Sequence, residues 1–289
     1  MKTILIPIDF SDHSVSTYKY AVKIIGNESD AKLLLHHSYN DQVTVPDPGM
    51  NSGFDNESFL NMQLIEEFRK QAEIKMENLK NEVINFLDEN KLNNIMVETS
   101  VTGGDPDWEI LGLCNDIKPD LVVMGTQGTG KKEIFEGSTA KKIMNKANIP
   151  VIAVPEMEDE FGELKIMYAC NNHKKDYAKI QLLSKLFENI PVVIFVVHFH
   201  FKDSKDSNLS LIDELRDSFQ NSEVKKQINF ILVDTFDKDD ALEAIIKEYG
   251  INTIAFISHK TNIFKYLFSE GITKNDFFKQ GLPMIALHE

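Results

Sequence analysis

The sequence predicts an α/β fold built from two tandem, doubly wound parallel sheets of five strands each. Three observations support this prediction. Short apolar runs alternate with segments of helical periodicity, which is typical of a parallel sheet covered by helices. The chain of 289 residues is long enough for two domains. The pattern of the first half also restarts in the second, so we expect one domain over residues 1–156 and another over residues 163–289.

Five apolar runs in the first half are predicted strands, because near-continuous apolar residues are typical of buried parallel strands. These strands are expected at Lys2–Ile8, Ala31–His36, Asn94–Thr99, Leu121–Met124 and Pro150–Val154. Residues Tyr39–Asn61 lack periodicity and are rich in Asn, Asp, Gly, Pro and Ser, which predicts a long loop. Residues Gln63–Asn90 carry apolar side chains at helical spacing and are a predicted helix.

The second half repeats this pattern after a short acidic linker, Glu156–Gly162. Its predicted strands are Leu164–Asn171, Pro191–His198, Ile228–Asp234, Ile251–Ile257 and Pro283–Leu287. An offset of 162 residues places Ile4 on Ile166, Pro7 on Ala169, Asp9 on Asn171 and His36 on His198. A later offset of 133 places Leu121 on Ile254, Gly125 on Ser258, Gly128 on Thr261 and Pro150 on Pro283. The chain is therefore an internal duplication whose second copy lacks a middle segment, expected within the Tyr39–Asn61 loop and the helix after it.

A glycine-rich stretch follows the fourth predicted strand. Gly125, Gly128 and Gly137 let backbone N–H groups approach an anion closely, and Ser138 and Thr139 open the next predicted helix. The spacing, G-x2-G-x8-G-S, is neither a P-loop nor a dinucleotide fingerprint. We interpret the stretch as an anion site suited to nucleotide phosphates, although turns between strand and helix would also use glycines.

Asp9, His37 and Gly125 come just after three separate predicted strands. The carboxyl ends of parallel strands lie at one edge of a sheet, where open α/β sheets bind their ligands. We therefore expect these residues to border one site. Asp9 could coordinate Mg²⁺ or hydrogen-bond to a ligand, and it could equally cap the strand end.

The glycine spacing resembles the ATP-binding signature of the universal stress protein family, G-x2-G-x9-G-(S/T), with one residue fewer between the last two glycines. The opening with Pro7 and Asp9 and the element Gly104-Asp105-Pro106 resemble the same family. The resemblance spans nearly the whole chain and implies a tandem member with a Rossmann-like, adenine nucleotide alpha hydrolase-like fold. It implies that ATP, with or without Mg²⁺, is held by Pro7, Ile8, Asp9, His37, Gly104, Met124, Gly125, Gly128, Gly137, Ser138 and Thr139.

This resemblance implies a cytoplasmic stress-response regulatory protein rather than an enzyme, with an adenine nucleotide as ligand and an unknown protein partner. It also implies a pseudo-dimer within one chain, to which a homodimer could be added. The alternative is a dimeric interaction or scaffold protein that binds no nucleotide because the shortened loop has lost ATP. Slow ATP hydrolysis is a third class, without a visible general base or arginine finger. Gly128→Val should abolish binding if the loop holds phosphate.

The second copy has lost the residues of the predicted site. Asn171, Ser258 and Thr261 replace the aspartate and two glycines, and Ile272 follows Gly271. Side chains at these positions would block a close approach to phosphate, so we expect no ATP binding of the same kind there. An aromatic-rich stretch in this half is expected to form core, an apolar ligand pocket or a dimer face: Phe264, Tyr266, Leu267, Phe268, Phe277 and Phe278.

Composition excludes several other functions. A net charge of −14 argues against a broad nucleic-acid surface, which would need a basic face. No apolar stretch approaches the ~20 residues of a membrane span, and Asp9 comes too early for a signal peptide, so we expect no membrane association.

The cysteines and histidines do not form a recognisable metal motif. Cys114 and Cys170 are far apart in the sequence and are expected to be reduced, buried thiols. The pairs His36-His37 and His198-x-His200 lack the carboxylate or cysteine partners that would complete a ligand set, so we predict no metal site.

Overall fold

A computed structural model describes residues 1–11, 13–27, 30–41, 54–126, 138–156, 162–170, 173–201, 210–220, 227–235, 238–258 and 281–288. The first half contains β1 (Lys2–Pro7), α1 (His13–Ile25), β2 (Ala31–Tyr39), α2 (Phe54–Glu89), β3 (Ile95–Gly103), α3 (Pro106–Asp116), β4 (Leu121–Gly125), α4 (Ser138–Lys146) and β5 (Val151–Val154). The second half contains β6 (Leu164–Ala169), α5 (His173–Leu186), β7 (Val192–Phe201), α6 (Ser210–Ser218), β8 (Ile228–Thr235), α7 (Lys238–Tyr249), β9 (Thr253–Ser258) and β10 (Met284–His288).

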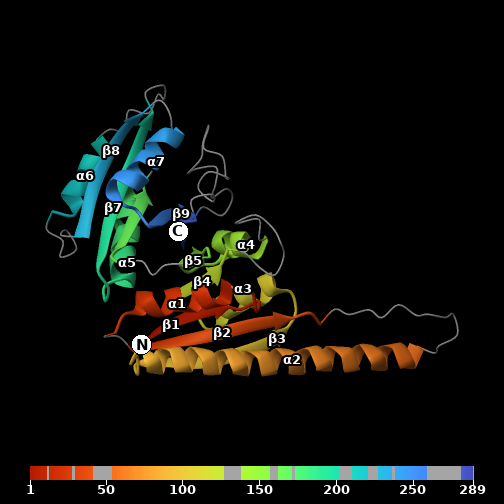
Figure 1. Cartoon of the computed structure of the whole chain (residues 1–289). Helices are drawn as coiled ribbons and strands as arrows, with labels where there is room; N and C mark the ends of the chain where they lie inside the picture. Colours follow the sequence, from red (N-terminus) through yellow and green to blue (C-terminus); the bar gives the residue numbers. More distant parts are fainter. Residues whose placement is uncertain are drawn as a thin grey trace.

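The described strands form one ten-stranded sheet in the order β3-β2-β1-β4-β5-β10-β9-β6-β7-β8 (Figure 1). Within each half all strand pairs are parallel, which confirms the predicted α/β class and doubly wound topology. The two predicted sheets are joined, because β5 pairs antiparallel with β10, with Ile152 opposite Ile285. This pairing satisfies the backbone groups that two apolar edge strands would otherwise leave unpaired.

The predicted strands are all present, and the main difference lies in the predicted loop before α2. This helix begins at Phe54, so the last part of the Tyr39–Asn61 loop is helical. Residues 42–53 lie outside the described residues, as do 259–280, which hold Thr261, Gly271, Ile272 and the aromatic-rich stretch, and 171–172, which hold Asn171. The domain boundaries near residues 156 and 163 stay a prediction.

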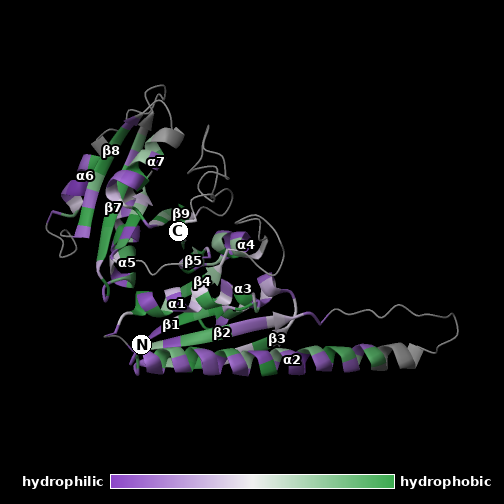
Figure 2. Cartoon of the chain, in the orientation of Figure 1, coloured by the Kyte–Doolittle hydropathy of each residue, from purple (hydrophilic) through white to green (hydrophobic). Residues whose placement is uncertain are grey.

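The long helix α2 covers one face of β2 and β3 and extends beyond the strands (Figure 1). Ala72, Met76, Leu79, Val83 and Leu87 are buried at intervals of four, three, four and four residues, so one stripe faces the sheet. Figure 2 shows the matching alternation of hydrophilic and hydrophobic residues along this helix.

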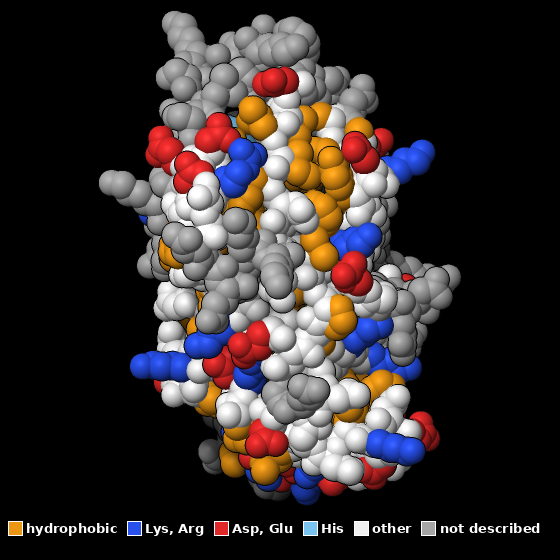
Figure 3. Space-filling view, turned by 90° about the vertical axis from the view of Figure 1, so that its left-hand side faces the viewer, with side chains coloured by type: hydrophobic (Ala, Val, Ile, Leu, Met, Phe, Trp, Pro, Cys, Tyr) orange, Lys and Arg blue, Asp and Glu red, His pale blue; other side chains and the backbone are white. Residues whose placement is uncertain are grey.

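The second half has a much shorter helix in the corresponding place. Helix α6 spans 9 residues where α2 spans 36, which agrees with the predicted loss of a middle segment. The edge strand β8 is accordingly less covered, and Leu232 is 39% exposed. In the space-filling view of this side, hydrophobic side chains gather on the upper part of the molecule, which belongs to the second half (Figure 3).

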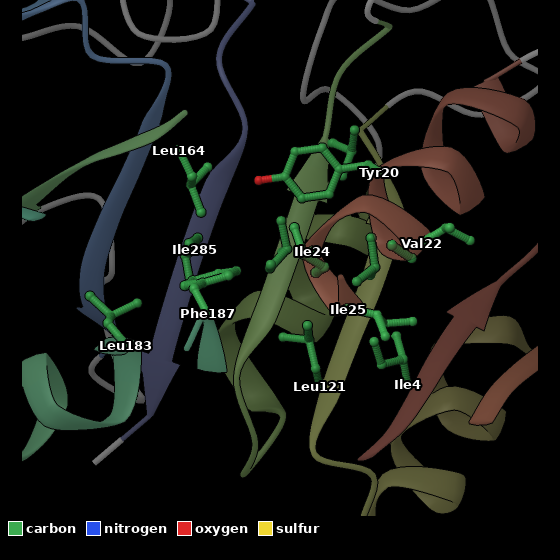
Figure 4. Close-up of a cluster of buried hydrophobic side chains, with 14 of the residues drawn as sticks. Ile4, Tyr20, Val22, Ile24, Ile25, Leu121, Leu164, Leu183, Phe187 and Ile285 are labelled. Carbon is green, nitrogen blue, oxygen red and sulfur yellow. The ribbon is translucent and has the colours of Figure 1, made fainter. Parts of the chain in front are cut away.

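One hydrophobic core runs through both halves. Ile24, Ile25 and Leu121 of the first half belong to the same buried cluster as Phe187 and Ile285 of the second (Figure 4). On the opposite face of the sheet, α3 and α4 pack over a second cluster that also includes residues of both halves. Burial of apolar surface across the β5–β10 junction therefore holds the two halves together.

The hydrogen-bond pattern corrects the predicted equivalence of His36 and His198. The Nδ1–H of His37 donates to the Ile8 carbonyl oxygen at 2.7 Å, and the Nδ1–H of His198 donates to the Cys170 carbonyl oxygen at 3.1 Å. Ile8 and Cys170 each follow the first strand of their half. His198 is thus the counterpart of His37, because the chain between the first two strands is one residue shorter in the second half.

The second offset also differs by one residue from the prediction. Ile4 pairs with Leu121 in the first half, and Ile166 pairs with Thr253 in the second. Thr253, and not Ile254, therefore corresponds to Leu121.

As a consequence, Ile257 takes the place of Gly125, and Ser258 falls one position further along. The predicted match of Pro150 with Pro283 is confirmed, since each proline carbonyl accepts the equivalent backbone N–H at 3.0 Å. A constant offset cannot detect one-residue changes that lie between strands, whereas the pairing register can.

Candidate functional site

The first half has its topological switch point between β1 and β4. Strand β1 pairs with β2 along its whole length, Lys2–Pro7, but with β4 only at Ile4 and Leu5. In an open α/β sheet, ligands bind beyond the carboxyl ends of the strands at such a point. We call the carboxyl ends of β1 to β5 the carboxyl edge. As predicted, Pro7 lies there at the end of β1, directly followed by Ile8 and Asp9, and Met124 and Gly125 lie there at the end of β4.

Asp9 is exposed at the end of β1 and holds the turn that leads into α1. Its Oδ1 accepts hydrogen bonds from the Ser11 backbone N–H at 3.0 Å and from the Ser11 hydroxyl at 2.6 Å. The predicted capping role is therefore confirmed. The carboxylate also places a negative charge at the carboxyl edge, where a ligand's hydroxyl groups or a cation could meet it.

His37 is turned toward β1 by its hydrogen bond to Ile8. The bond assigns the proton to Nδ1, and burial lowers the pKa of the imidazole, so His37 is neutral near pH 7. The ring of Phe10 lies 4.4 Å from the His37 ring, and the Lys75 ammonium lies 5.5 Å from the Phe10 ring centre. A base that stacked on His37 would therefore share the imidazole with Phe10.

Gly104 lies at the same edge but is not adjacent to the switch point. Strand β3 is separated from β1 by β2, a distance of about 10 Å for two strand spacings. Gly104 has a φ of +139°, and a Cβ there would lie 2.9 Å from Oε1 of Glu109. Its N–H donates to the Tyr39 carbonyl oxygen at 3.0 Å. The turn into α3 thus requires glycine at this position, which explains the residue without a ligand.

The remaining predicted residues lie in the glycine-rich connection between β4 and α4 or at the start of α4. Gly128 and Gly137 lie outside the described residues. Ser138 is the first residue of α4 and Thr139 the second. Lys142, one turn further, is paired with Asp107 of α3, and this carboxylate raises the pKa of the lysine. Its charge is therefore used to join two helices.

Thr126 was not predicted, although it directly follows Gly125. Its side chain is 2% exposed, and its Oγ1 has no hydrogen-bond partner. Ser258, its counterpart in the second half, is also 2% exposed with an unpartnered hydroxyl. Leaving a buried hydroxyl unpaired costs about 1–3 kcal/mol. The sequence feature that could have pointed to Thr126 is its place as a polar residue between the first two glycines of the motif.

Replacing the Thr126 hydroxyl by a methyl group, in Thr126→Val, should raise the free energy of unfolding by about 1 kcal/mol, since an unpaired buried group is removed. The control is Thr253→Val, because Thr253 is equally buried but donates to the Asn252 carbonyl oxygen at 2.8 Å. Urea unfolding should show a gain for the first variant and a loss for the second. Losses in both would mean that Thr126 is hydrogen-bonded in solution.

The corresponding edge of the second half has a different chemistry. Ile257 stands where the first half has Gly125, while His198 keeps the hydrogen bond that His37 makes. Nearby, the Tyr168 hydroxyl donates to Oδ1 of Asp176 at 2.6 Å, and both residues are buried. The second half therefore retains the hydrogen bond of this histidine and replaces the glycine by a residue with a large side chain.

Other kinds of site receive little support from the part of the chain that is described. No cluster of three or more His, Cys, Asp or Glu residues suitable for a metal ion occurs there. None of the helices in the described ranges is both long and apolar enough to cross a bilayer. Cys114 and Cys170 are buried and unpaired, and burial raises the pKa of the Cys114 thiol to about 11, which keeps it unreactive at neutral pH.

Comparison with known sequences assigns the first half to a family. The sequence model described as "Universal stress protein family" matches residues 1–155, which include both strands of the switch point and the glycine-rich stretch. The chain belongs to the universal stress protein family. The predicted family resemblance is thereby confirmed.

Two universal stress proteins of Methanocaldococcus jannaschii are among its relatives. One is 28% identical over 162 residues, which cover 53% of this chain and 94% of the relative. The other is 29% identical over 160 residues, covering 55% of this chain and 85% of the relative. Both relatives are thus about the length of one half of this universal stress protein.

Solved structures extend the likeness to both halves. The crystal structure of a universal stress protein from Archaeoglobus fulgidus superposes with a TM-score of 0.61 and 16% identity, over 99% of this chain and 96% of that one. A putative universal stress protein from Pseudomonas aeruginosa gives a TM-score of 0.53 and 10% identity, over 100% and 93% of the two chains. At these identities the structures support the fold alone.

Proposed function

We propose that this universal stress protein is a cytoplasmic stress-response regulator that binds ATP, with Mg²⁺, at the switch point of its first half. The unpartnered hydroxyl of Thr126 beside Gly125 carries this proposal, because the equally unpartnered Ser258 of the second half stands beside Ile257, whose side chain occupies the position that Gly125 leaves open. A buried polar group without a partner at a ligand-binding edge is explained if a ligand supplies the partner. Membership of the family supports an adenine nucleotide as that ligand.

The residues of the carboxyl edge have complementary roles in this proposal. Neutral His37 and the apolar Ile8 contact the adenosine end, and Asp9 accepts a hydrogen bond from a sugar hydroxyl or holds Mg²⁺. Phosphate lies against the backbone around Gly125 and the amino end of α4 at Ser138, where unpaired N–H groups favour an anion.

Thermal unfolding with and without ATP–Mg²⁺ tests the proposal. At a free ATP concentration ~100-fold above its Kd, the native state should gain about 2.7 kcal/mol. Thr126→Val should lose most of this ligand-induced shift. Ser258→Ala removes the corresponding hydroxyl from the second half and should keep the whole shift, which makes it the matched control.

Mass analysis of nucleotide released from the purified protein provides a second readout. If the purified wild-type protein releases no nucleotide and shows no thermal shift with ATP–Mg²⁺, the proposal is overturned. A scaffold protein that binds no nucleotide is then favoured. In that case the glycine spacer, one residue shorter than the family signature, has lost its phosphate contact.

We further propose that the protein binds ATP without turning it over. Phosphoryl transfer to water usually needs a positioned base and an arginine or equivalent cation. The chain has two arginines, and both are ion-paired on their own helices: Arg69 with Glu66 and Arg216 with Asp213. Steady release of phosphate at a rate proportional to protein concentration, and abolished by Thr126→Val, would contradict this part.

A further inference from the structure

The only tryptophan of the chain stands in solvent beside a cavity. Trp108, on the first turn of α3, is 74% exposed. The cavity has a volume of ≈ 250 Å³ and lies between α3 and the end of α4, two helices that pack side by side (Figure 1). Its lining includes Trp108, Leu111, Gly112, Cys114, Lys146 and Asn148. Neither the fold nor the proposed nucleotide site uses this feature.

The size of the cavity indicates what it can hold. Small-molecule sites usually have volumes of ~300–1,000 Å³, so ≈ 250 Å³ admits one aromatic ring rather than a whole nucleotide. The floor is apolar, with Leu111 and the buried Cys114, while Lys146 and Asn148 are exposed at the rim. Gly112 contributes to the open shape, because a Cβ on it would meet no atom within 4 Å. Such a cavity fits the aromatic anchor of a protein interface.

The charges around the cavity favour a second copy of this chain as the partner. Trp108 projects from an acidic turn with Asp105 and Glu109, whereas Asp107 in the same turn is already neutralised by Lys142. The opposite wall of the cavity, at the end of α4, carries Lys146. One surface thus presents both an aromatic anchor with acidic neighbours and an apolar cavity with a basic rim. A surface that is complementary to itself is what a two-fold dimer requires.

We propose that two copies of the protein associate through α3 and α4, each placing Trp108 in the cavity of the other. The acidic turn of each copy then lies against Lys146 of its partner. The contact is small, and each chain carries a net charge of −14, so the dimer is weak and reversible. This association differs from the β5–β10 junction, which is already formed within one chain.

Sedimentation over a concentration series up to about 1 mM, the weak end of specific association, tests the proposal on the full chain without nucleotide. Mass should rise from monomer to dimer with concentration. Because Trp108 is the chain's single tryptophan, its emission should move to shorter wavelength in parallel as the indole leaves water.

Three variants locate the contact. Gly112→Leu fills the cavity without a clash inside the monomer, so it should abolish association while leaving the thermal midpoint unchanged or higher. Lys146→Glu should weaken the dimer at least tenfold, as it places like charges together. Met96→Ala removes an exposed apolar side chain from β3, outside the cavity, and should associate as the wild type does.

A protein that stays monomeric over the whole series overturns the proposal and leaves the cavity to a different protein partner. Association without a change in emission, or association that Gly112→Leu does not affect, overturns it as well, because another surface would then join the copies. A change in emission at constant monomer mass has the same consequence.

Discussion

Gly26→Ala should destabilise the protein by about 2–4 kcal/mol, although it adds one methyl group. Gly26 follows α1 with a φ of +73°, a conformation that costs an alanine about 1 kcal/mol. A Cβ there would lie 2.7 Å from the Asn189 carbonyl oxygen and 3.2 Å from Cγ2 of Ile190. Asn189 belongs to the second half, and the atom in question is its backbone oxygen, so the two halves must move apart to make room. Overpacking of this kind typically costs about 1–3 kcal/mol.

Gly281→Ala is the matched control for this prediction. Gly281 has a φ of +61°, and a Cβ there meets no atom within 4 Å, so only the conformational cost of about 1 kcal/mol remains. Chemical unfolding of both variants separates the two contributions. Equal losses of unfolding free energy would show that the two halves do not make a tight contact at Gly26.

The contact at Gly26 is one of several that make the two halves a single packing unit. The Lys2 ammonium donates to the Leu186 carbonyl oxygen at 3.0 Å, and the His288 imidazole to the Met144 carbonyl oxygen at 2.9 Å. Together with the shared core, these bonds tie α5 of the second half to β1 and α4 of the first half to β10. A loss of packing at the junction should therefore destabilise both halves. A substitution at Gly26 should for this reason lower the free energy of unfolding more than one in a surface turn.

The strands were predictable because their apolar composition reflects burial on both faces. Where polar residues continue a strand, a prediction from the apolar pattern ends that strand too early. Strand β2 runs on to Tyr39, past His36 and Ser38, because both continue the parallel pairing with β3. His36 is accepted there because its ring nitrogens meet the hydroxyls of Ser38 and Ser100. Ser38 lies on the same strand, but Ser100 comes from β3, so half of this compensation is invisible in a local pattern.

The joining of the two sheets was not predictable for a different reason. The runs that become β5 and β10 are short and apolar, VIAV and MIALH, and nothing in them specifies which edge they will pair with. The same limit applies to the equivalence of His37 and His198, where a one-residue difference between strands defeats a constant offset.

At the candidate site, strand ends followed by Asp9 and Gly125 were sufficient to locate the carboxyl edge, because parallel topology brings them together. Thr126 was missed, since a threonine beside glycine is ordinary in a turn. What distinguishes it is burial without a partner, and both properties depend on how the surrounding elements pack. Sequence can thus propose the chemistry of a site, whereas a buried group without a hydrogen-bond partner is recognised only in the folded structure.

His36 should make the stability of the protein strongly dependent on acid. The imidazole is 1% exposed, with Nε2 3.1 Å from the Ser38 hydroxyl and Nδ1 3.4 Å from the Ser100 hydroxyl. Burial, and then the neighbouring His37, lowers the pKa of His36 to about 4. The unfolded chain takes up the proton near pH 6.5, so it binds more protons than the native state between these values. Stability is therefore complete above pH 6.5 and falls by about 3 kcal/mol as the pH drops toward 4.

Comparison with His36→Gln isolates this effect. Glutamine can keep hydrogen bonds to both hydroxyls but does not titrate. The unfolding free energy of the wild type, minus that of His36→Gln, should therefore fall by about 3 kcal/mol as the pH is lowered from 7 to 4. The pKa of His37 is also lowered by burial, but this histidine is present in both proteins and its contribution largely cancels. A constant difference across this range would mean that His36 ionises equally in the folded and unfolded chains, and that the two serines do not hold a neutral imidazole in the sheet.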